Sequence, residues 1–213
     1  KDLIMGTTAD FWDRVSFKYS KKDVPSEDIY QEKLKRTQKL FKNNSIVMEF
    51  GCGTGTTSLI HAPYVKEIIS YDYSPGMISI ANKKKDDQQI TNVTFEIKSV
   101  EDIPFHHETY DIIMAHSILH LTQNNETILK NVYESLVPGG FFVSSSGCIK
   151  EMNFLIRKII PFMTSIGKAP DITLFSADEL IELHKVTGFK LYDVWKYKKG
   201  ELFLIAQKKY RKP

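Results

Sequence analysis

From about residue 45 onward, short apolar runs rich in β-branched residues alternate with segments whose apolar positions have helical spacing. The runs that predict strands are residues 45–50, 67–71, 93–98, 110–115, 141–144, 190–197 and 201–207. The segments that predict helices begin or lie at residues 56–61, 74–85, 122–136 and 176–188. This alternation is typical of a doubly wound α/β sheet with helices on both of its faces.

Details of three segments refine the predicted sheet. Residues 110–115 form a continuous apolar run, which suits a strand buried on both faces, as in a parallel sheet. Only Lys198, Lys199 and Gly200 separate the last two runs, and so short a link predicts an antiparallel hairpin at the end of the sheet. Before that hairpin, a capping-box pattern at residues 176–179 and the stop signal Gly188 bound the last helix.

Two segments stand outside the alternation. The first, residues 11–41, carries aromatic side chains among charged ones: Phe11, Trp12, Phe17, Tyr19 and Tyr30. The second, residues 149–170, has an amphipathic pattern, and its Arg157-Lys158 pair argues against a membrane-spanning helix while allowing contact with an interface. Each segment is expected either to cover an active site or to pack as a plain structural element.

Composition adds few constraints. The chain is 42% hydrophobic and 26% charged, and its net charge of +3 is spread over short lysine runs, so it indicates an anionic partner only weakly. Cys52 and Cys148 lie far apart without metal-ligand spacing, which predicts no disulfide framework, no metal site and a reducing cytoplasm. No apolar run reaches the roughly 18 residues of a transmembrane segment.

A glycine-rich turn at residues 49–55 lies between the first strand and the first helix of the sheet. Such a turn lets the backbone approach a ligand closely and directs free N–H groups at it, although isolated glycine pairs also serve simple turns. Asp72 ends the second strand at the distance of roughly 20 residues where a carboxylate meets ribose hydroxyls. Together the two features predict a nucleotide-like cofactor.

The residues around the turn discriminate between cofactors. The dinucleotide fingerprint needs glycine or alanine at position 56, where this chain has Thr56. Glu49 places a negative charge beside the turn, which suits a cationic amine or sulfonium better than a pyrophosphate. The pattern therefore favours S-adenosylmethionine (SAM), and an NAD-dependent oxidoreductase is the weaker alternative.

Four motifs in order resemble those of class I SAM-dependent methyltransferases of the small-molecule type. They are Val47-Met48-Glu49-Phe50-Gly51-Cys52-Gly53-Thr54-Gly55, the acid and turn at residues 71–78, the adenine-side loop at residues 100–105, and the turn Leu136-Val137-Pro138-Gly139-Gly140. The resemblance implies a seven-stranded Rossmann-like sheet, mostly parallel, with an antiparallel last strand. It also implies one domain over residues 1–213: a helical lid (1–43), a SAM-binding core (44–148), a helical cap (149–172), and a final helix with a hairpin (173–213).

The same resemblance implies a set of cofactor-binding residues: Tyr19, Glu49, Gly51, Gly53, Asp72, Tyr73, Met77, Ser99, Val100, Glu101, His116 and Ser117. The glycines would lie against the methionine part, with Glu49 near its amine and Tyr19 near its carboxylate. Asp72 would bind the ribose, and the residues from 73 to 101 would surround the adenine. Many relatives have an acid where this chain has Ser99, so Glu101 is expected to bind the adenine amine instead.

Methyl transfer is an in-line displacement that holding the two reactants in place can accelerate, so it needs no conspicuous catalytic residue. If the acceptor carries a proton, His116 and His120 are the candidate bases, because they follow the fourth strand at the edge where ligands collect. The alternative is that His116 lines the cofactor pocket and His120 packs locally.

The segment Ala115-His116-Ser117-Ile118 differs from the Asn/Asp-Pro-Pro-aromatic motif of methyltransferases that act on base amino groups or on glutamine. We therefore expect a small-molecule or lipid-like acceptor. A nucleic-acid methyltransferase, supported by scattered lysines and the basic residues 208–212, is one alternative. The other is a SAM-binding sensor or partner subunit without catalysis. The residues specify neither the acceptor atom nor the oligomeric state.

Overall fold

The computed structural model describes residues 8–22, 24–166 and 169–210. Its strands are β1 (Ile46–Phe50), β2 (Glu67–Asp72), β3 (Val93–Ile97), β4 (Tyr110–His116), β5 (Leu136–Gly147), β6 (Lys190–Lys198) and β7 (Glu201–Gln207). The α-helices are α1 (Thr8–Ser20), α2 (Glu27–Gln38), α3 (Thr56–His61), α4 (Pro75–Asp87), α5 (Asn125–Ser135), α6 (Phe154–Ser165) and α7 (Ala177–Thr187). Short 3₁₀ turns are η1 (Ala62–Tyr64), η2 (Val100–Asp102), η3 (Leu119–Leu121) and η4 (Ile149–Glu151).

The seven strands form one sheet in the order β3-β2-β1-β4-β5-β7-β6. Strand β1 pairs in parallel with β2 and with β4, whereas β7 is antiparallel to both of its neighbours, β5 and β6. The predicted doubly wound Rossmann-like sheet with an antiparallel last strand is confirmed. The strand order reverses between β1 and β4, and in such sheets ligands bind beyond the carboxyl ends of the strands at this reversal.

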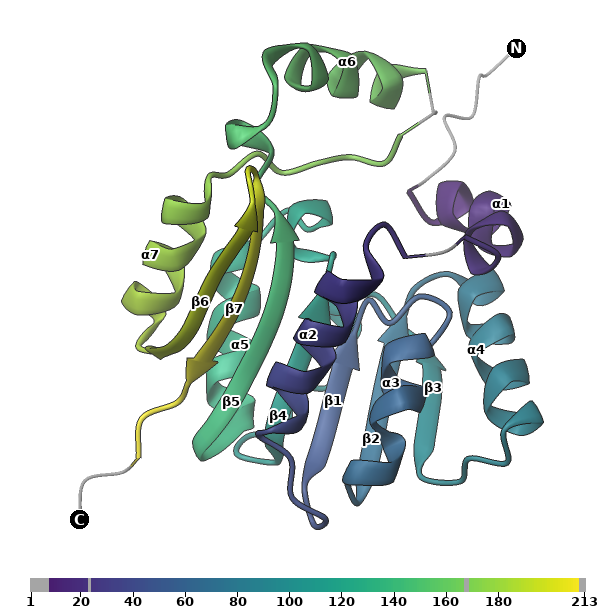
Figure 1. Ribbon diagram of the computed structural model, residues 1–213, viewed down its shortest axis with the longest axis vertical. Coiled ribbons are helices and arrows are strands. Elements are labelled where there is room, and N and C mark those ends of the chain that lie inside the picture. The colour runs from purple at the N-terminus through teal and green to yellow at the C-terminus, as the bar shows by residue number, and fades with distance from the viewer. Residues whose placement is uncertain (1–7, 23, 167–168, 211–213) are drawn as a thin grey trace.

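Helices cover both faces of the sheet, as predicted (Figure 1). One apolar layer includes Leu129 of α5 and Leu180 of α7. The other includes Leu59 of α3 and Ile78 of α4. The strands β1, β4 and β7 between these layers are almost fully buried, which explains their continuous apolar runs, whereas the edge strands β3 and β6 are partly exposed.

The region around α5 and β5 differs from its prediction. The predicted helix at residues 122–136 begins only at α5, where Asn124 caps the first turn by accepting a hydrogen bond from the Thr127 N–H at 3.3 Å. Strand β5 begins at Leu136 and runs through the expected turn, because the backbones of Gly139 and Gly140 exchange hydrogen bonds with Lys208 at 3.0 and 2.9 Å. Pairing with a distant segment therefore extends this strand.

The predicted signals around α7 are confirmed. Ser176 and Glu179 form the full capping box, and Gly188 ends the helix in the left-handed region at φ +111°. The hairpin of β6 and β7 follows.

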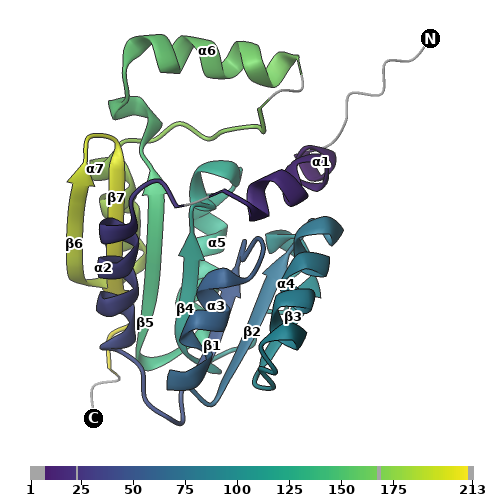
Figure 2. The ribbon, with the colours of Figure 1, turned by 45° about the vertical axis from the view of Figure 1, so that its right-hand side comes forward.

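Two helices lie at the edge of the molecule formed by the carboxyl ends of the parallel strands (Figures 1 and 2). Helix α6 lies beyond the end of β5, and α1 lies beside the start of α4. Within the described ranges, no helix has both the length and the apolarity needed to cross a membrane.

Candidate functional site

The glycine turn follows β1 directly, and all three of its glycines have positive φ angles: +67° at Gly51, +54° at Gly53 and +72° at Gly55. A Cβ atom at Gly51 would lie 2.7 Å from Ile118, and one at Gly55 would lie 2.5 Å from Phe95. A Cβ atom at Gly53 would meet nothing within 4 Å. Gly51 and Gly55 therefore serve packing, whereas Gly53 faces open space from which a ligand can approach the backbone.

Asp72 joins this turn to the end of β2. One of its carboxylate oxygens accepts a hydrogen bond from the Gly53 N–H at 2.8 Å, and the other accepts one from the Ser74 N–H at 3.0 Å. Burial raises the pKa of Asp72, and these two backbone bonds partly offset the rise. The acid is thus fixed in orientation, and each oxygen keeps a further lone pair for a ligand hydroxyl.

A pocket of about 60 Å³ opens next to Asp72. Its lining residues are Phe50, Gly51, Asp72, Tyr73, Lys98, Val100, Glu101, Ile103, Ile118, Leu121 and Thr122. Five of the predicted site residues are brought together here: Gly51, Asp72, Tyr73, Val100 and Glu101. Apolar side chains together with the carboxylates of Asp72 and Glu101 are the chemical groups that would hold an adenosine, so the lining residues match the nucleoside part of SAM in chemistry.

Other predicted residues lie outside this lining. Met77 is only 2% exposed, and its N–H donates to the Ser74 hydroxyl at 3.1 Å. The Ser99 hydroxyl donates a hydrogen bond to the Glu101 carboxylate at 2.8 Å. Ser99 therefore orients Glu101, the acid that was expected to bind the adenine amine. Tyr19 of α1 packs edge-on against Trp12 with 5.9 Å between ring centroids, and partial burial and then the charge of Asp72 raise its pKa.

Glu49 lies beneath the glycine turn and is 2% exposed. Its carboxylate accepts a hydrogen bond from the Ser58 hydroxyl at the start of α3, and Ser58 in turn contacts Ser70 at 2.8 Å. Burial raises the pKa of Glu49 to about 7, with the bond from Ser58 acting against the rise and the charge of Asp72 adding to it. Glu49 therefore changes charge near neutral pH.

Sequence reasoning missed Asp13 of α1. One oxygen of Asp13 accepts hydrogen bonds from the Ser74 hydroxyl and from the Gly76 N–H, the latter at 2.9 Å. A Cβ atom at Gly76 would lie 2.8 Å from the Ser16 hydroxyl, so α1 can dock this closely only against glycine. Asp13 thus anchors α1 to the segment that follows Asp72. A local sequence pattern cannot predict this contact, because the two residues are 61 positions apart.

Tyr30 of α2 was named only as one of the N-terminal aromatic residues. Its hydroxyl lies 3.2 Å from the hydroxyl of Thr57 at the start of α3. Burial raises the pKa of Tyr30, the bond to Thr57 opposes the rise, and the charge of Glu49 adds to it. The cluster of aromatic residues in segment 11–41 was the sequence signal that could have indicated a role for Tyr30 beside that of Tyr19.

The two candidate bases lie at the end of β4 and just beyond it. His116 Nδ1 is 3.3 Å from the Ser145 hydroxyl, and burial lowers the pKa of His116 to about 3 and that of His120 to about 4. Ser117 between them has φ +56°, and its N–H donates to the Ser145 carbonyl at 2.8 Å. Both imidazoles are neutral at pH 7 and weakly basic, so a role in proton transfer stays a prediction.

The Asp13 anchor gives a prediction that needs no ligand. Asp13→Ala removes both hydrogen bonds, each worth about 1 kcal/mol, so trypsin should cleave after Lys18 in α1 at least about fivefold faster. Mass spectrometry of the early fragments measures this rate. Asp28→Ala, at an exposed acid of α2, is the matched control, and equal rates in the two variants would refute the anchoring role.

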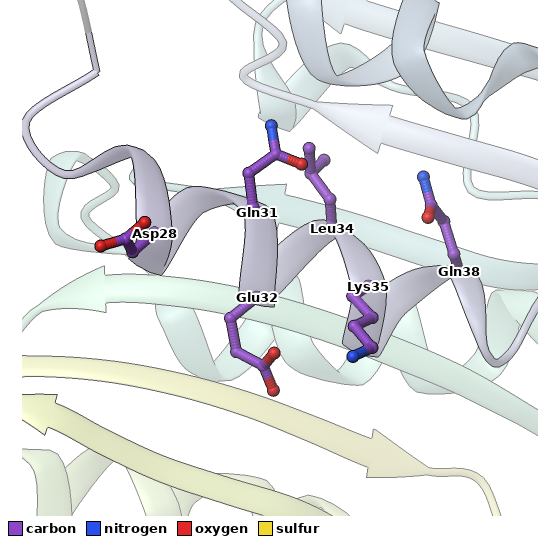
Figure 3. Close-up of a pocket in the computed structure, with 6 residues that line it drawn as sticks. All are labelled: Asp28, Gln31, Glu32, Leu34, Lys35 and Gln38. Atoms are coloured by element: carbon purple, nitrogen blue, oxygen red, sulfur yellow. The ribbon is translucent and has the colours of Figure 1, made fainter.

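A larger cavity of about 290 Å³ lies along α2. Its lining is Asp28, Gln31, Glu32, Leu34, Lys35 and Gln38. Figure 3 shows Gln31 and Leu34 on one side of the helix and Glu32 on the other. These side chains diverge around a single helix and none is a predicted site residue, so we place the site at the glycine turn instead.

Comparison with known proteins agrees with this fold. The family model described as a methyltransferase domain matches residues 41–194. The uncharacterized methyltransferase YcgJ of Bacillus subtilis is 29% identical over 97 residues, which are 46% of this chain and 38% of that protein. A malonyl-[acyl-carrier protein] O-methyltransferase of Bacillus cereus is 27% identical over 150 residues, 66% of this chain and 53% of that protein. The chain thus spans about half the length, or less, of these relatives.

Solved structures with low sequence identity share the fold. A phospholethanolamine N-methyltransferase 2 of Haemonchus contortus has a TM-score of 0.77 at 13% identity, covering 97% of this chain and 61% of that one. A SAM-dependent methyltransferase of Mesorhizobium loti has a TM-score of 0.69 at 14% identity, covering 81% and 96%. With the family match and the glycine turn, these findings show that the chain belongs to the methyltransferase domain family and has its class I Rossmann-like fold.

Proposed function

We propose that this chain transfers a methyl group from SAM to a small-molecule or lipid-like acceptor. The observation that carries the proposal is the position of Asp72, which holds the Gly53 turn at 2.8 Å and borders a pocket with apolar walls. A related solved structure is described as SAM-dependent, which supports the choice of cofactor.

Different residues of the described chain bind different parts of the cofactor in this proposal. Asp72 accepts the ribose hydroxyls, the pocket beside Tyr73 takes the adenine, and the backbone at Gly53 meets the methionine part. Glu49 and the phenols of Tyr19 and Tyr30 face the charged end of the methionine part. When bound, SAM supplies a methyl group on a sulfonium, and its sulfur leaves without charge.

The acceptor site is proposed at the ends of β4 and β5, beside His116 and below α6. Neutral imidazoles and buried serines there can orient an acceptor and exclude water, which suffices for a displacement that depends on positioning. The relative from Bacillus cereus is named for malonyl-[acyl-carrier protein], and the structure from Haemonchus contortus contains phosphomonomethylethanolamine. These names favour a small acceptor here as well.

The purified chain should be titrated by calorimetry with SAM, S-adenosylhomocysteine and NAD, and then supplied with methyl-labelled SAM and a small-molecule extract. We expect binding of both sulfur ligands and label in the small-molecule fraction. Binding of NAD without either sulfur ligand would overturn the cofactor assignment. Label in added RNA or DNA would favour a nucleic-acid methyltransferase, and binding without any transfer would favour a sensor or partner subunit.

The pKa of Glu49 predicts how SAM binding depends on pH. A carboxylate attracts the cationic amine and a protonated carboxyl does not, so the dissociation constant of SAM should rise as the pH falls through about 7. The rise in the dissociation constant should approach about tenfold per pH unit, down to the pH at which Glu49 is protonated in the SAM complex as well. Glu49→Gln should flatten this profile, while Glu126→Gln, at an exposed site on α5, should keep it. A flat profile in the unaltered chain would contradict the assignment.

A further inference from the structure

Helix α6 exposes an apolar stripe. Leu155 and Ile159 lie four residues apart, which places them on one side of the helix, and Ile166 follows directly after its last residue. Their exposed fractions are 62%, 53% and 46%, and that of Phe154 is 61%. This stripe is therefore largely accessible to water.

The base of α6 is fixed although its stripe is exposed. Before the helix, Ile149 of η4 is buried. After it, the Thr173 N–H donates to the His120 carbonyl at 2.8 Å, and the Thr173 hydroxyl donates to the Thr122 carbonyl. The stripe is thus not needed to hold the helix at the carboxyl edge of the sheet.

Helix α1 and the residues after it add an aromatic ring and cations at the same edge (Figures 1 and 2). Phe17 is 66% exposed, and the ammonium of Lys21 lies 4.1 Å from the centroid of its ring. Further exposed cations are Arg14, Lys18 and Lys22, and α6 contributes Arg157.

Charge distinguishes these two helices from an ordinary exposed surface. Among the described residues of α1 and α6 that are exposed, none is acidic. The exposed acids nearest to them along the described chain, Glu27 and Asp171, lie outside both helices. An apolar stripe beside exposed cations matches the surface of a bilayer, which has an apolar interior below negatively charged head groups.

We propose that the exposed side chains of α1 and α6, with Lys21 and Lys22, form a surface that binds an anionic lipid bilayer. The apolar side chains of α6 enter the boundary of the acyl chains, and the cations of α1 meet the lipid phosphates. This binding does not depend on methyl transfer. If the proposed function also holds, the carboxyl edge with its acceptor site faces the membrane, and the acceptor is a molecule dissolved in the bilayer.

Sedimentation of the full chain with vesicles tests the proposal. The vesicles contain phosphatidylcholine alone or with about 30% phosphatidylglycerol. We expect binding to the anionic vesicles only, weakened when NaCl is raised from about 50 to 500 mM. Two variants should each lower the partition coefficient by about tenfold or more: Lys18→Gln/Lys21→Gln/Lys22→Gln, and Leu155→Gln/Ile159→Gln.

A matched control carries the same loss of charge at the opposite edge of the sheet. Lys39→Gln/Lys42→Gln/Lys66→Gln removes three exposed lysines near the starts of β1 and β2, and it should leave binding unchanged. An equal loss in this control would mean that net charge alone drives binding and would overturn the proposal. Absence of binding to anionic vesicles would also overturn it, as would light scattering that shows the stripe of α6 buried between two copies of this chain. Circular dichroism verifies that each variant is folded.

Discussion

Gly53→Ala is expected to abolish SAM binding in a protein that remains folded, whereas Gly55→Ala is expected to destabilise the fold. The two glycines have similar positive φ angles, so the strain of a left-handed alanine, about 1–2 kcal/mol, is common to both. A methyl group at Gly55 would additionally lie 2.5 Å from the ring of Phe95. At Gly53 it would meet no protein atom and would fill the space proposed for the cofactor.

Thermal unfolding and calorimetry separate the two effects. Gly55→Ala should lose about 3 kcal/mol or more of unfolding free energy, because overpacking adds to the strain. Gly53→Ala should lose only the strain, yet bind S-adenosylhomocysteine at least about a hundredfold more weakly, because backbone approach requires glycine. Unchanged binding by a folded Gly53→Ala variant would refute the proposed position of the methionine part.

Asp72→Ala is expected to weaken cofactor binding by about a hundredfold, since hydrogen bonds to a charged group contribute about 1.5–3 kcal/mol each. The substitution removes the acceptor for the ribose and also releases the N–H groups of Gly53 and Ser74, which lie 2.8 and 3.0 Å from the carboxylate. The first loss removes a contact with the cofactor, and the second loosens the glycine turn that the cofactor approaches.

Asp111→Ala provides a matched control for Asp72→Ala. Asp111 also accepts a backbone hydrogen bond, from the Ile46 N–H at 2.8 Å, but it lies at the amino end of β4, away from the glycine turn. The control should lose a comparable amount of stability and keep the affinity for S-adenosylhomocysteine. Equal affinities in the two variants would show that Asp72 does not contact the ribose.

Features encoded by neighbouring residues could be predicted from the sequence. Apolar runs located the strands, and the motifs around Gly51, Asp72 and Glu101 named residues that do line one pocket. Each of these residues ends or follows a parallel strand, and the fold brings such ends to one edge. A local motif plus the fold therefore suffices for this half of the site.

Features that depend on distant partners could not be predicted. Strand β5 is longer than its apolar run because Gly140 pairs with Lys208, and Asp13 joins the site because α1 docks on α4. The histidines were recognisable as candidates, but their burial and hence their low pKa values follow only from the packed structure. Sequence spacing carries no information on such contacts.

The bonds of Asp13 also affect where the functional unit begins. The family match starts at residue 41, after α1 and α2, and the sheet is complete without them. A fragment cut at that boundary would keep the Asp72 carboxylate and the glycine turn but lose Asp13, Tyr19 and Tyr30. The N-terminal helices thus lie outside the matched segment, yet they carry side chains that we propose contact the methionine part, so a fragment defined by the family match alone would lack part of the proposed cofactor site.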